Sequence, residues 1–464
     1  MKKPVKSLEE LLDSVRNIEG FPNGTDEDIL TLSDPPYYTA CPNPYINDFI
    51  KEYGTPYDEE TDDYHREPFV GDVSEGKNNS IYNAHAYHTK VPHQAIKKFI
   101  GYYTNENDIV FDGFSGTGMT GVAAIELKRN VVMSDLSSIG SFISYNYNKS
   151  WTLDDIDLCK AIITDLENEI SWMFETKHPG KDDKPGIITN IIWSDVFICP
   201  YCASEIVFFN VAVKDGSVKN TFECQNCLAS LTKDQCEHQK CTIFDEFLNQ
   251  NLEQAVQKPV VVNYKYKKSK FTKKFDKFDE ELLEKVNNQK FPFWVPTNIL
   301  KDGDNTKQPI NSHGFTHEHH FYTKRNLYIL GLFYQKISKL NRPYLISFFT
   351  SILNNLTKRY RYRTTGGGGP SGNLYIPSIS KEINPIIAYR SKIRSFFPTN
   401  ENKITNFSIS TQSATELENI ANNSIDYIFT DPPFGSNIMY SEMSIFWESW
   451  IKIYTNDSKE KWPQ

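Results

Sequence analysis

Four consecutive residues near the C-terminus, Asp431-Pro432-Pro433-Phe434, have the types and order needed to position an amino group for chemistry. The apolar and β-branched run at 425–429 predicts a buried strand that ends at the aspartate. The two prolines force a rigid, extended turn, which fixes the Asp431 side chain and the Pro432 carbonyl as neighbouring acceptors. Two such acceptors suit an exocyclic amino group, and Phe434 offers a flat face for a base taken out of its stack. The alternative is a plain strand-end turn, in which Asp431 only caps and the prolines only stop the strand.

A second stretch, Asp108 to Gly121, reads DIVFDGFSGTGMTG. It predicts a strand at 109–111 and a tight glycine turn, followed by a helix at 119–127 and a second strand at 131–133. Asp135 follows that second strand. This order is typical of a nucleotide-binding half-unit, in which the acid accepts hydrogen bonds from a ribose.

Three motifs together resemble those of a known family. They are FxGxG at Phe114, Gly116 and Gly118, DPPF at 431–434, and HTKVP at 88–92. These motifs are similar to the cofactor, catalytic and leading motifs of amino-methyltransferases, which methylate adenine N6 or cytosine N4 in DNA with S-adenosylmethionine. Their order, with a long insert before the catalytic motif, resembles the family's α arrangement, in which the insert recognises the target.

The resemblance implies an α/β fold with a Rossmann-like methyltransferase sheet, and it assigns site residues by position. The catalytic residues would be Asp431, Pro432, Pro433 and Phe434. The cofactor-binding residues would be His88, Lys90, Pro92, Asp112, Phe114, Gly116, Gly118, Asp135 and Ser413. Asp112 occupies the position next to the cofactor's charged amino group. The family often carries an acid near the adenine, but it is absent at 412–415, so Ser413 or its backbone is expected to substitute.

Two CxxC pairs, Cys199–Cys202 and Cys224–Cys227, predict a structural zinc site. Each pair places two sulfurs on one tight turn, and two turns complete a tetrahedral set of four. With a hairpin expected at 206–222, residues 196–232 read as a zinc ribbon. A redox CxxC needs only one pair, and a further site at Cys236, His238 and Cys241 is a weaker alternative.

The length and the net charge of the chain restrict its number of domains and its contacts with DNA. A length of 464 residues predicts two or three domains, and a net charge of −9 restricts DNA contact to local basic patches. Two such patches are the lysine-rich stretch 258–277 and the alternating Arg-Tyr strip 358–363, which precedes four glycines at 366–369. Neither a signal peptide nor a membrane-spanning run is evident, so we expect a cytoplasmic protein.

The predicted domains follow the motifs. They are an N-terminal extension (1–80), the cofactor-binding half (81–150), an insert with the ribbon (151–345), a basic and glycine-rich segment (346–405) and the catalytic half (406–464). Outside the ribbon, the insert shows no comparable β-rich series. The resemblance implies three more strands after the catalytic one, and the chain shows only a helix at 440–454. We therefore expect a truncated catalytic half, an exposed sheet edge and a second polypeptide that completes the sheet.

Several alternatives stay open at this stage. A second Asp-Pro-Pro-aromatic sequence, residues 34–37, precedes the cofactor motif, and the later copy is preferred because a helix follows it. The histidine-rich segment 313–326 is read as a loop leading into a helix, with a metal site as its alternative. The expected function is site-specific DNA methylation, with adenine N6 preferred and restriction-modification as the expected setting. The alternatives are an RNA or protein amide methyltransferase and a catalytically silent DNA-binding subunit.

Overall fold

The computed structural model describes residues 6–76, 79–180, 184–340, 342–370, 373–396, 406–433 and 439–457. The chain forms two compact units, each assembled from separate stretches of sequence. Unit 1 contains residues 1–159, 340–351 and 392–464, and unit 2 contains residues 160–339 and 352–391. The predicted N-terminal extension and both predicted halves of the methyltransferase domain therefore fall in unit 1.

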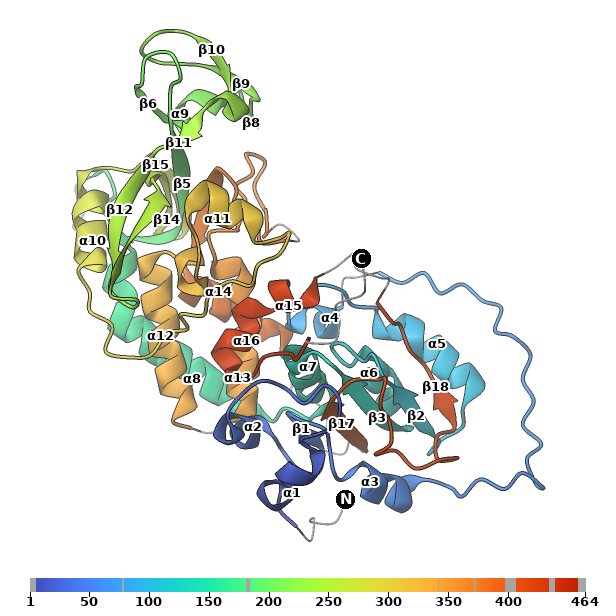
Figure 1. Ribbon diagram of the computed structural model, residues 1–464. Helices are drawn as coiled ribbons and strands as arrows, with labels where there is room; N and C mark the ends of the chain where they lie inside the picture. The colour runs from blue at the N-terminus through green and yellow to red at the C-terminus, as the bar shows by residue number, and fades with distance from the viewer. Residues whose placement is uncertain are drawn as a thin grey trace. The chain divides into compact units, whose positions relative to one another are not determined.

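A parallel sheet of five strands, in the order β1-β17-β3-β2-β18, lies at the centre of unit 1 (Figure 1). Its strands are β1 (Tyr38–Thr39), β2 (Ile109–Asp112), β3 (Asn130–Asp135), β17 (Phe407–Thr411) and β18 (Tyr427–Ile428). The helices of unit 1 are α1 (Leu8–Val15), α2 (Asp26–Leu32), α3 (Ile46–Tyr53), α4 (Ser80–Ala84), α5 (His93–Tyr103), α6 (Met119–Glu126), α7 (Ser138–Asn148), α13 (Pro343–Thr350), α15 (Tyr440–Met443) and α16 (Ile445–Ile451).

Helices cover both faces of this sheet, as a parallel sheet requires. On one face, α3 packs Phe49 and Ile50 against Ile109 and Phe111 of β2 and against Val132 of β3. Helices α5, α6 and α7 lie on the other side of the strands (Figure 1). The result is a mixed α/β unit that is compatible with a methyltransferase fold.

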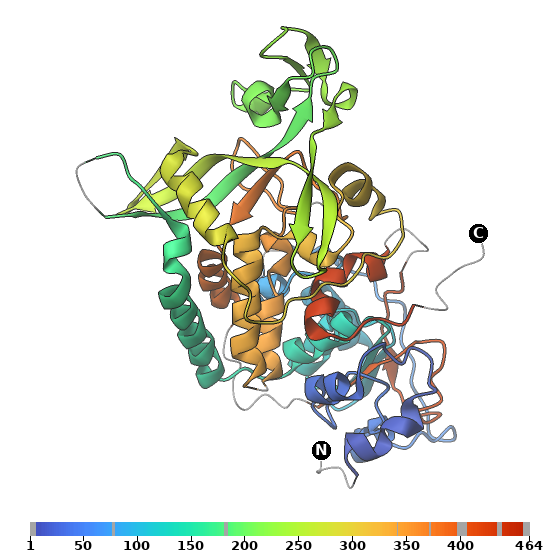
Figure 2. The same ribbon diagram turned by 60° about the vertical axis from the view of Figure 1, so that its left-hand side comes forward.

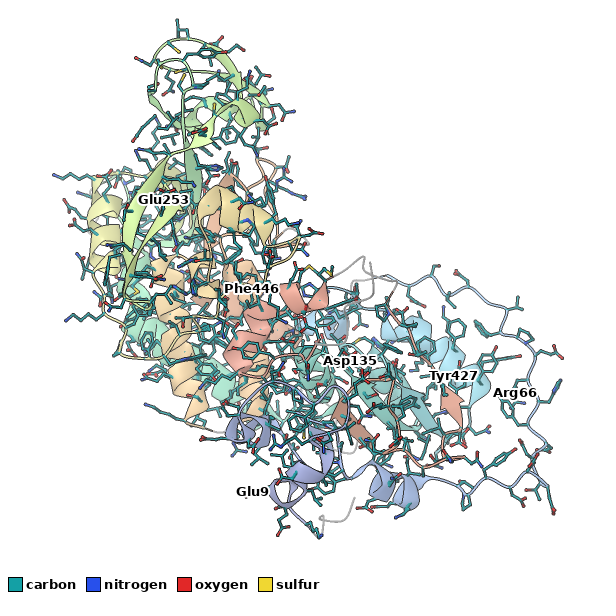
Figure 3. All side chains as sticks on the ribbon, in the orientation of Figure 1. Glu9, Arg66, Asp135, Glu253, Tyr427 and Phe446 are labelled. Atoms are coloured by element: carbon teal, nitrogen blue, oxygen red, sulfur yellow. The ribbon has the colours of Figure 1, made fainter. Side chains whose placement is uncertain are left out.

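The early part of the chain contributes more to this unit than its polar sequence suggests. Residues 29–32, which precede the early Asp-Pro-Pro copy, belong to helix α2. Strand β1 follows that copy and pairs in parallel with β17. Between α3 and α4, residues 54–76 form no helix or strand, and Arg66 lies on this outlying segment whereas Asp135 lies within the body of the unit (Figure 3).

Unit 2 is built around one long strand, β5 (Gly186–Ile198), which belongs to a sheet of seven strands. Its other members are β4 (Glu175–Thr176), β6 (Glu205–Val207), β11 (Glu237–His238), β14 (Gln257–Tyr266), β15 (Ser269–Lys274) and β16 (Ile379–Ile383). The remaining strands are β7 (Val213–Lys214), β8 (Ser217–Val218), β9 (Thr221–Glu223), β10 (Ser230–Thr232), β12 (Lys240–Asp245) and β13 (Gln250–Ala255). The helices are α9 (Phe208–Ala212), α10 (Lys277–Asn287), α11 (Lys307–His313) and α12 (Lys324–Ser338); α8 (Leu153–Ile170) and α14 (Pro385–Lys392) straddle the boundary between the units.

The expectation that the insert lacks a β-rich series outside the ribbon is therefore wrong. The lysine-rich stretch is largely the antiparallel hairpin β14–β15, in which Tyr264 and Tyr266 are buried and the intervening Lys265 is exposed. This alternation has the period of a strand, and the many lysines conceal it.

The ribbon also differs in detail from the predicted hairpin at 206–222. Strand β5 runs from the main sheet into the ribbon, where it pairs with β6 and β11 (Figures 1 and 2). Helix α9 and the short pair β7–β8 occupy most of the expected hairpin, and β9 pairs with β10 across the second cysteine pair. No helix among the described residues is both long and apolar enough to cross a membrane.

Candidate functional site

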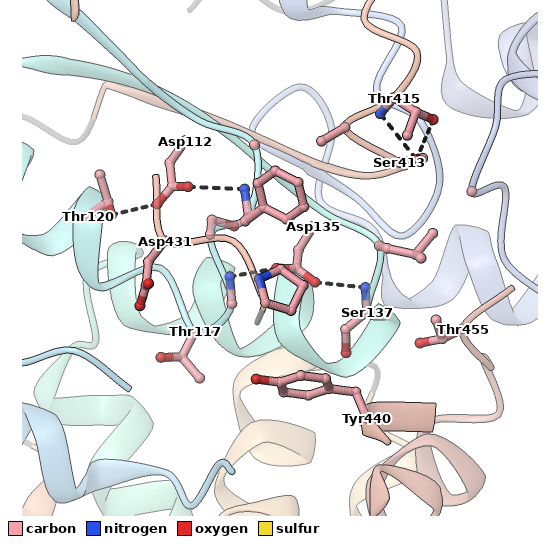
Figure 4. Close-up of a pocket in the computed structure, with 18 of the residues that line it drawn as sticks. Asp112, Thr117, Thr120, Asp135, Ser137, Ser413, Thr415, Asp431, Tyr440 and Thr455 are labelled. Carbon is pink, nitrogen blue, oxygen red and sulfur yellow. Dashed lines mark hydrogen bonds between the residues drawn. The ribbon is translucent and has the colours of Figure 1, made fainter. Parts of the chain in front are cut away.

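A cavity of ≈ 780 Å³ lies in unit 1 at the carboxyl ends of β2, β3 and β18. Open α/β sheets bind their ligands at this edge, and the volume is in the usual range for a cofactor site. Eight of the predicted site residues line the cavity: Lys90, Asp112, Phe114, Gly116, Asp135, Ser413, Asp431 and Pro433. Figure 4 shows Asp112, Asp135 and Asp431 around this one space, although Asp431 lies about 300 positions after the other two acids.

Asp135 ends β3, and the backbone holds its carboxylate in place. Its two oxygens accept hydrogen bonds from the N–H of Gly116 at 2.7 Å and of Ser137 at 2.8 Å. Burial raises the pKa of Asp135 to about 6, in opposition to these two bonds. Each carboxylate oxygen has a further lone pair, so the group can also accept from ligand hydroxyls.

Asp112 ends β2 and is buried. It accepts from Thr120 Oγ1 at 2.5 Å and from the Phe114 N–H at 3.0 Å. Burial, with a smaller contribution from the negative charge of Asp135, raises the pKa of Asp112 to about 7. A buried acid with so high a pKa favours a cationic ligand, because a positive charge would stabilise its ionised form.

The two glycines of the FxGxG motif differ in their surroundings. Gly116 has φ +49°, and an added Cβ would lie 3.9 Å from its nearest neighbour, Tyr87. Gly118 has φ +72°, and an added Cβ would lie 2.1 Å from Ser144 Oγ. Gly118 does not line the cavity. Because a side chain at this position would collide with Ser144 of α7, the glycine allows α6 to pack closely against α7.

The leading motif forms one wall of the cavity. Lys90 lines it, but its ammonium donates to the carbonyls of Tyr82 and His85, and burial lowers its pKa to about 7. The ring of His88 packs 5.0 Å from Trp447, between ring centres, and does not line the cavity. Pro92 also lies outside the lining, at the N-cap of α5.

The predicted catalytic motif begins three residues after the end of β18. Asp431, Pro432 and Pro433 are exposed, and Asp431 and Pro433 line the cavity whereas Pro432 does not. Phe434 lies outside the described residues. Tyr440 also lines the cavity, and its hydroxyl is 2.9 Å from Thr89 Oγ1.

The early Asp-Pro-Pro copy occupies a different place. The Asp34 carboxylate accepts from Tyr145 Oη at 2.5 Å and Lys149 Nζ at 2.9 Å, and Asp34 does not line the cavity. Its contacts tie the segment before β1 to helix α7.

The sequence motifs gave no indication that residues 16–21 line the cavity. The Ser413 N–H donates to the Glu19 carbonyl at 3.0 Å, and the Glu19 N–H donates to Glu416 Oε2 at 3.1 Å. The backbone N–H of Ser413, expected to substitute for the missing acid, is thus already bonded within the chain. Glu416, three residues after Ser413, does line the cavity with a carboxylate. Its closeness to Ser413 in the sequence could have identified it as the missing acid.

These residues fit S-adenosylmethionine. Buried Asp112 suits the cofactor's amino group, the anchored Asp135 suits its ribose hydroxyls, and the space above Gly116 is open. Phe114 leaves 41% of its surface exposed at the cavity, which provides an apolar contact.

The four cysteines of the ribbon converge in unit 2. The Sγ atoms of Cys199 and Cys227 are 3.7 Å apart, as are those of Cys202 and Cys224. Four sulfurs about 2.3 Å from a central Zn²⁺ would be separated by about 3.8 Å. Ala203 and Leu228, both with positive φ, close the two turns by bonding back to the carbonyls of Cys199 and Cys224. The geometry therefore fits a Cys₄ metal site.

The parallel sheet of unit 1, with Asp112, Asp135 and the Asp-Pro-Pro turn around one cavity, is compatible with a methyltransferase fold. Residues 3–153 match the sequence model of the N6/N4-methyltransferase family, described as DNA methylase. This match supports an S-adenosylmethionine-dependent enzyme that methylates amino groups in DNA. The matched range includes Asp34 and ends before Asp431. Among the curated proteins and the solved structures, no match to the chain was found.

Proposed function

We propose that the cavity of unit 1 transfers a methyl group to an exocyclic amino group of a DNA base, with adenine N6 as the preferred target. The observation that carries this proposal is the presence of Asp112, Asp135 and Asp431 on one cavity at three strand ends. The first two suit the cofactor, and the third belongs to a rigid turn suited to an amine.

The cofactor, when bound, supplies the methyl group. Asp431 and the Pro432 carbonyl accept hydrogen bonds from the two N–H groups of the target amine, which directs its lone pair into the cavity. The amine nitrogen gains the methyl group and releases one of its protons to solvent. Because the prolines restrict the backbone before substrate arrives, orientation provides much of the rate enhancement. Phe434 is assigned by sequence to stacking on the flipped base.

DNA contact is assigned to unit 2. A groove there is lined by Lys219 of the ribbon, by Lys233 directly after it, and by Arg361 and Arg363, with Asp234 as its one acid. Arg361 and Arg363 are exposed, and neither forms an ion pair with a described residue. These four cations suit phosphates.

The Arg-Tyr strip is only partly available for such contact. Arg359 is buried and donates through Nε and Nη2 to the carbonyl of Asn373 at 3.0 and 2.6 Å, while Lys358 lies 4.6 Å from the ring centre of Phe315. The expected continuous strip is therefore reduced to its second half.

We also propose that a second polypeptide pairs with β18. This strand is at the edge of the five-stranded sheet, and no described strand pairs with its outer side. Ile428 leaves 60% of its surface exposed there, which is unusual for a β-branched residue in a parallel sheet. We expect this chain to form a stable complex with the second polypeptide, and we expect Ile428→Lys to weaken that complex. Equal affinity of the wild type and the variant for the second polypeptide would contradict this interface.

The main test compares the two Asp-Pro-Pro copies. Asp431→Ala is expected to lower methyl transfer at least 100-fold while cofactor affinity stays within about twofold. Asp34→Ala is the matched control and should retain transfer. Methylated nucleosides are quantified by mass spectrometry after DNA digestion, with N6-methyladenine, N4-methylcytosine and RNA products measured in parallel. Activity lost in Asp34→Ala and kept in Asp431→Ala would overturn the assignment.

A further inference from the structure

Two clusters in unit 2 each join one aspartate to two histidines. In the first, Asp195 lies between His238 and His313, and in the second, Asp245 lies between His319 and His320. All six side chains come from elements outside the Cys₄ site. Their hydrogen bonds decide which cluster can bind a metal ion, because a neutral imidazole carries one proton and coordinates only through its other nitrogen.

In the second cluster, His320 is fixed as a hydrogen-bond donor to Asp245. Its Nδ1 accepts from the backbone N–H groups of Thr316 and His317, at 3.2 and 3.3 Å. The ring proton must then be on Nε2, which is 2.9 Å from Asp245 Oδ2. This nitrogen has no lone pair to offer, so the cluster is a hydrogen-bonded support for the histidine-rich loop.

In the first cluster the proton is on the opposite side of His313. The Ser312 hydroxyl donates its only proton to the Gln308 carbonyl at 2.5 Å, so the Ser312 oxygen must accept from His313 Nδ1, 2.7 Å away. In the neutral ring, Nε2 then presents a lone pair to Asp195 Oδ1 at 3.3 Å. Two lone pairs at this distance repel each other unless a cation or a second ring proton lies between them.

We propose that Asp195, His238 and His313 bind a divalent transition-metal ion of the kind that imidazole and carboxylate ligands favour, with Zn²⁺ foremost. His238 Nε2 lies 3.1 Å from Asp195 Oδ2, and all three ligand atoms lie within 4.8 Å of one another. Ligands about 2.0–2.1 Å from a tetrahedral ion would be about 3.3 Å apart. The side chains of Asp195 and His313 are 0% and 1% exposed, and Gln257 Nε2 donates to Asp195 Oδ1 at 2.9 Å, which orients the carboxylate.

The ion would fasten three elements of unit 2. Asp195 is on β5, His238 is on β11, 43 residues later, and His313 ends α11, 118 residues after Asp195. Three protein ligands leave one tetrahedral position for a water molecule. Because the ligands are buried and come from separate elements, the role of the ion is to stabilise the fold.

The test counts metal equivalents in the full chain. After removal of weakly bound metal, the wild type is expected to bind one more equivalent of Zn²⁺ than His313→Gln. His320→Gln, from the hydrogen-bonded cluster, is the matched control and should bind as many equivalents as the wild type. Equal counts in the wild type and His313→Gln would overturn the proposal. A loss of one equivalent in His320→Gln would contradict the tautomer argument.

Cobalt substitution of the wild type keeps the test decisive if His313→Gln does not fold. Co²⁺ at the four cysteines gives an intense thiolate charge-transfer band, whereas Co²⁺ at nitrogen and oxygen ligands gives only weak visible bands. During the titration, we expect one equivalent of Co²⁺ to increase the visible absorption without increasing the thiolate charge-transfer band. Saturation of both signals at the same equivalent would rule out the Asp195 site.

Discussion

Cofactor binding is expected to depend on pH through Asp112. Burial raises the pKa of this acid to about 7 in the free protein, and only its ionised form attracts the cofactor's ammonium group. The bound ammonium lowers that pKa, so binding releases a proton below pH 7. Affinity therefore rises as the pH passes upward through 7, and it levels off near pH 8.

The magnitude follows from the pKa. With a value of about 7, roughly one tenth of the free protein is ionised at pH 6 and roughly nine tenths at pH 8. The dissociation constant should thus be about tenfold larger at pH 6, equivalent to about 1.4 kcal/mol. Calorimetry in buffers of different ionisation enthalpy should detect about 0.9 proton released per cofactor at pH 6.

The variant Asp112→Asn distinguishes the contribution of Asp112 to this pH dependence from that of Lys90, whose pKa is also about 7. Asp112→Asn should bind the cofactor about tenfold more weakly at pH 8 and lose most of the pH dependence. Without cofactor, the variant should also be more stable than the wild type at pH 8. The pKa of Asp112 rises from 3.8 in the unfolded chain to about 7 in the folded protein, so the folded wild type loses stability as the pH rises between these two values. A wild-type affinity that is equal at pH 6 and pH 8, or an unchanged slope in the variant, would refute this reasoning.

Three further predictions concern the surroundings of the two sites. Gly118→Ala should lower the free energy of unfolding of unit 1 by about 2–4 kcal/mol, because its Cβ would collide with Ser144. Gly116→Ala, whose Cβ has no such neighbour, should lower it by only about 1–2 kcal/mol. Equal losses for the two variants in urea denaturation would contradict this explanation. Gly20→Ala, whose Cβ would lie 2.4 Å from the backbone nitrogen of residue 413, should weaken cofactor binding several-fold in calorimetry, whereas unchanged affinity would show that the N-terminal segment does not close the cavity. Cys224→Ser should release the metal of the ribbon and weaken DNA binding in an anisotropy titration while cofactor affinity is preserved, and intact DNA binding by a metal-free ribbon would separate the ribbon from DNA contact.

The sequence by itself determined the local elements around the motifs. Strands β2 and β3 and helix α6 lie where the glycine-rich pattern predicts them, because strand periodicity, positive-φ glycines and a helix start are short-range signals. The convergence of the four cysteines was also predictable from their spacing, since each CxxC forms a turn whose geometry depends on few residues.

Only the tertiary structure decided which of the two Asp-Pro-Pro copies shares a cavity with Asp112. Both copies have similar local chemistry, and the difference arises from strand order, which places β18 beside β2 and β1 at the far edge beyond β17. Strand order depends on pairing between residues hundreds of positions apart, and no local pattern encodes it. The same holds for the closure of the N-terminal segment over Ser413 and for the hydrogen bond that fixes the ring proton of His313, because each contact depends on a partner brought in by folding.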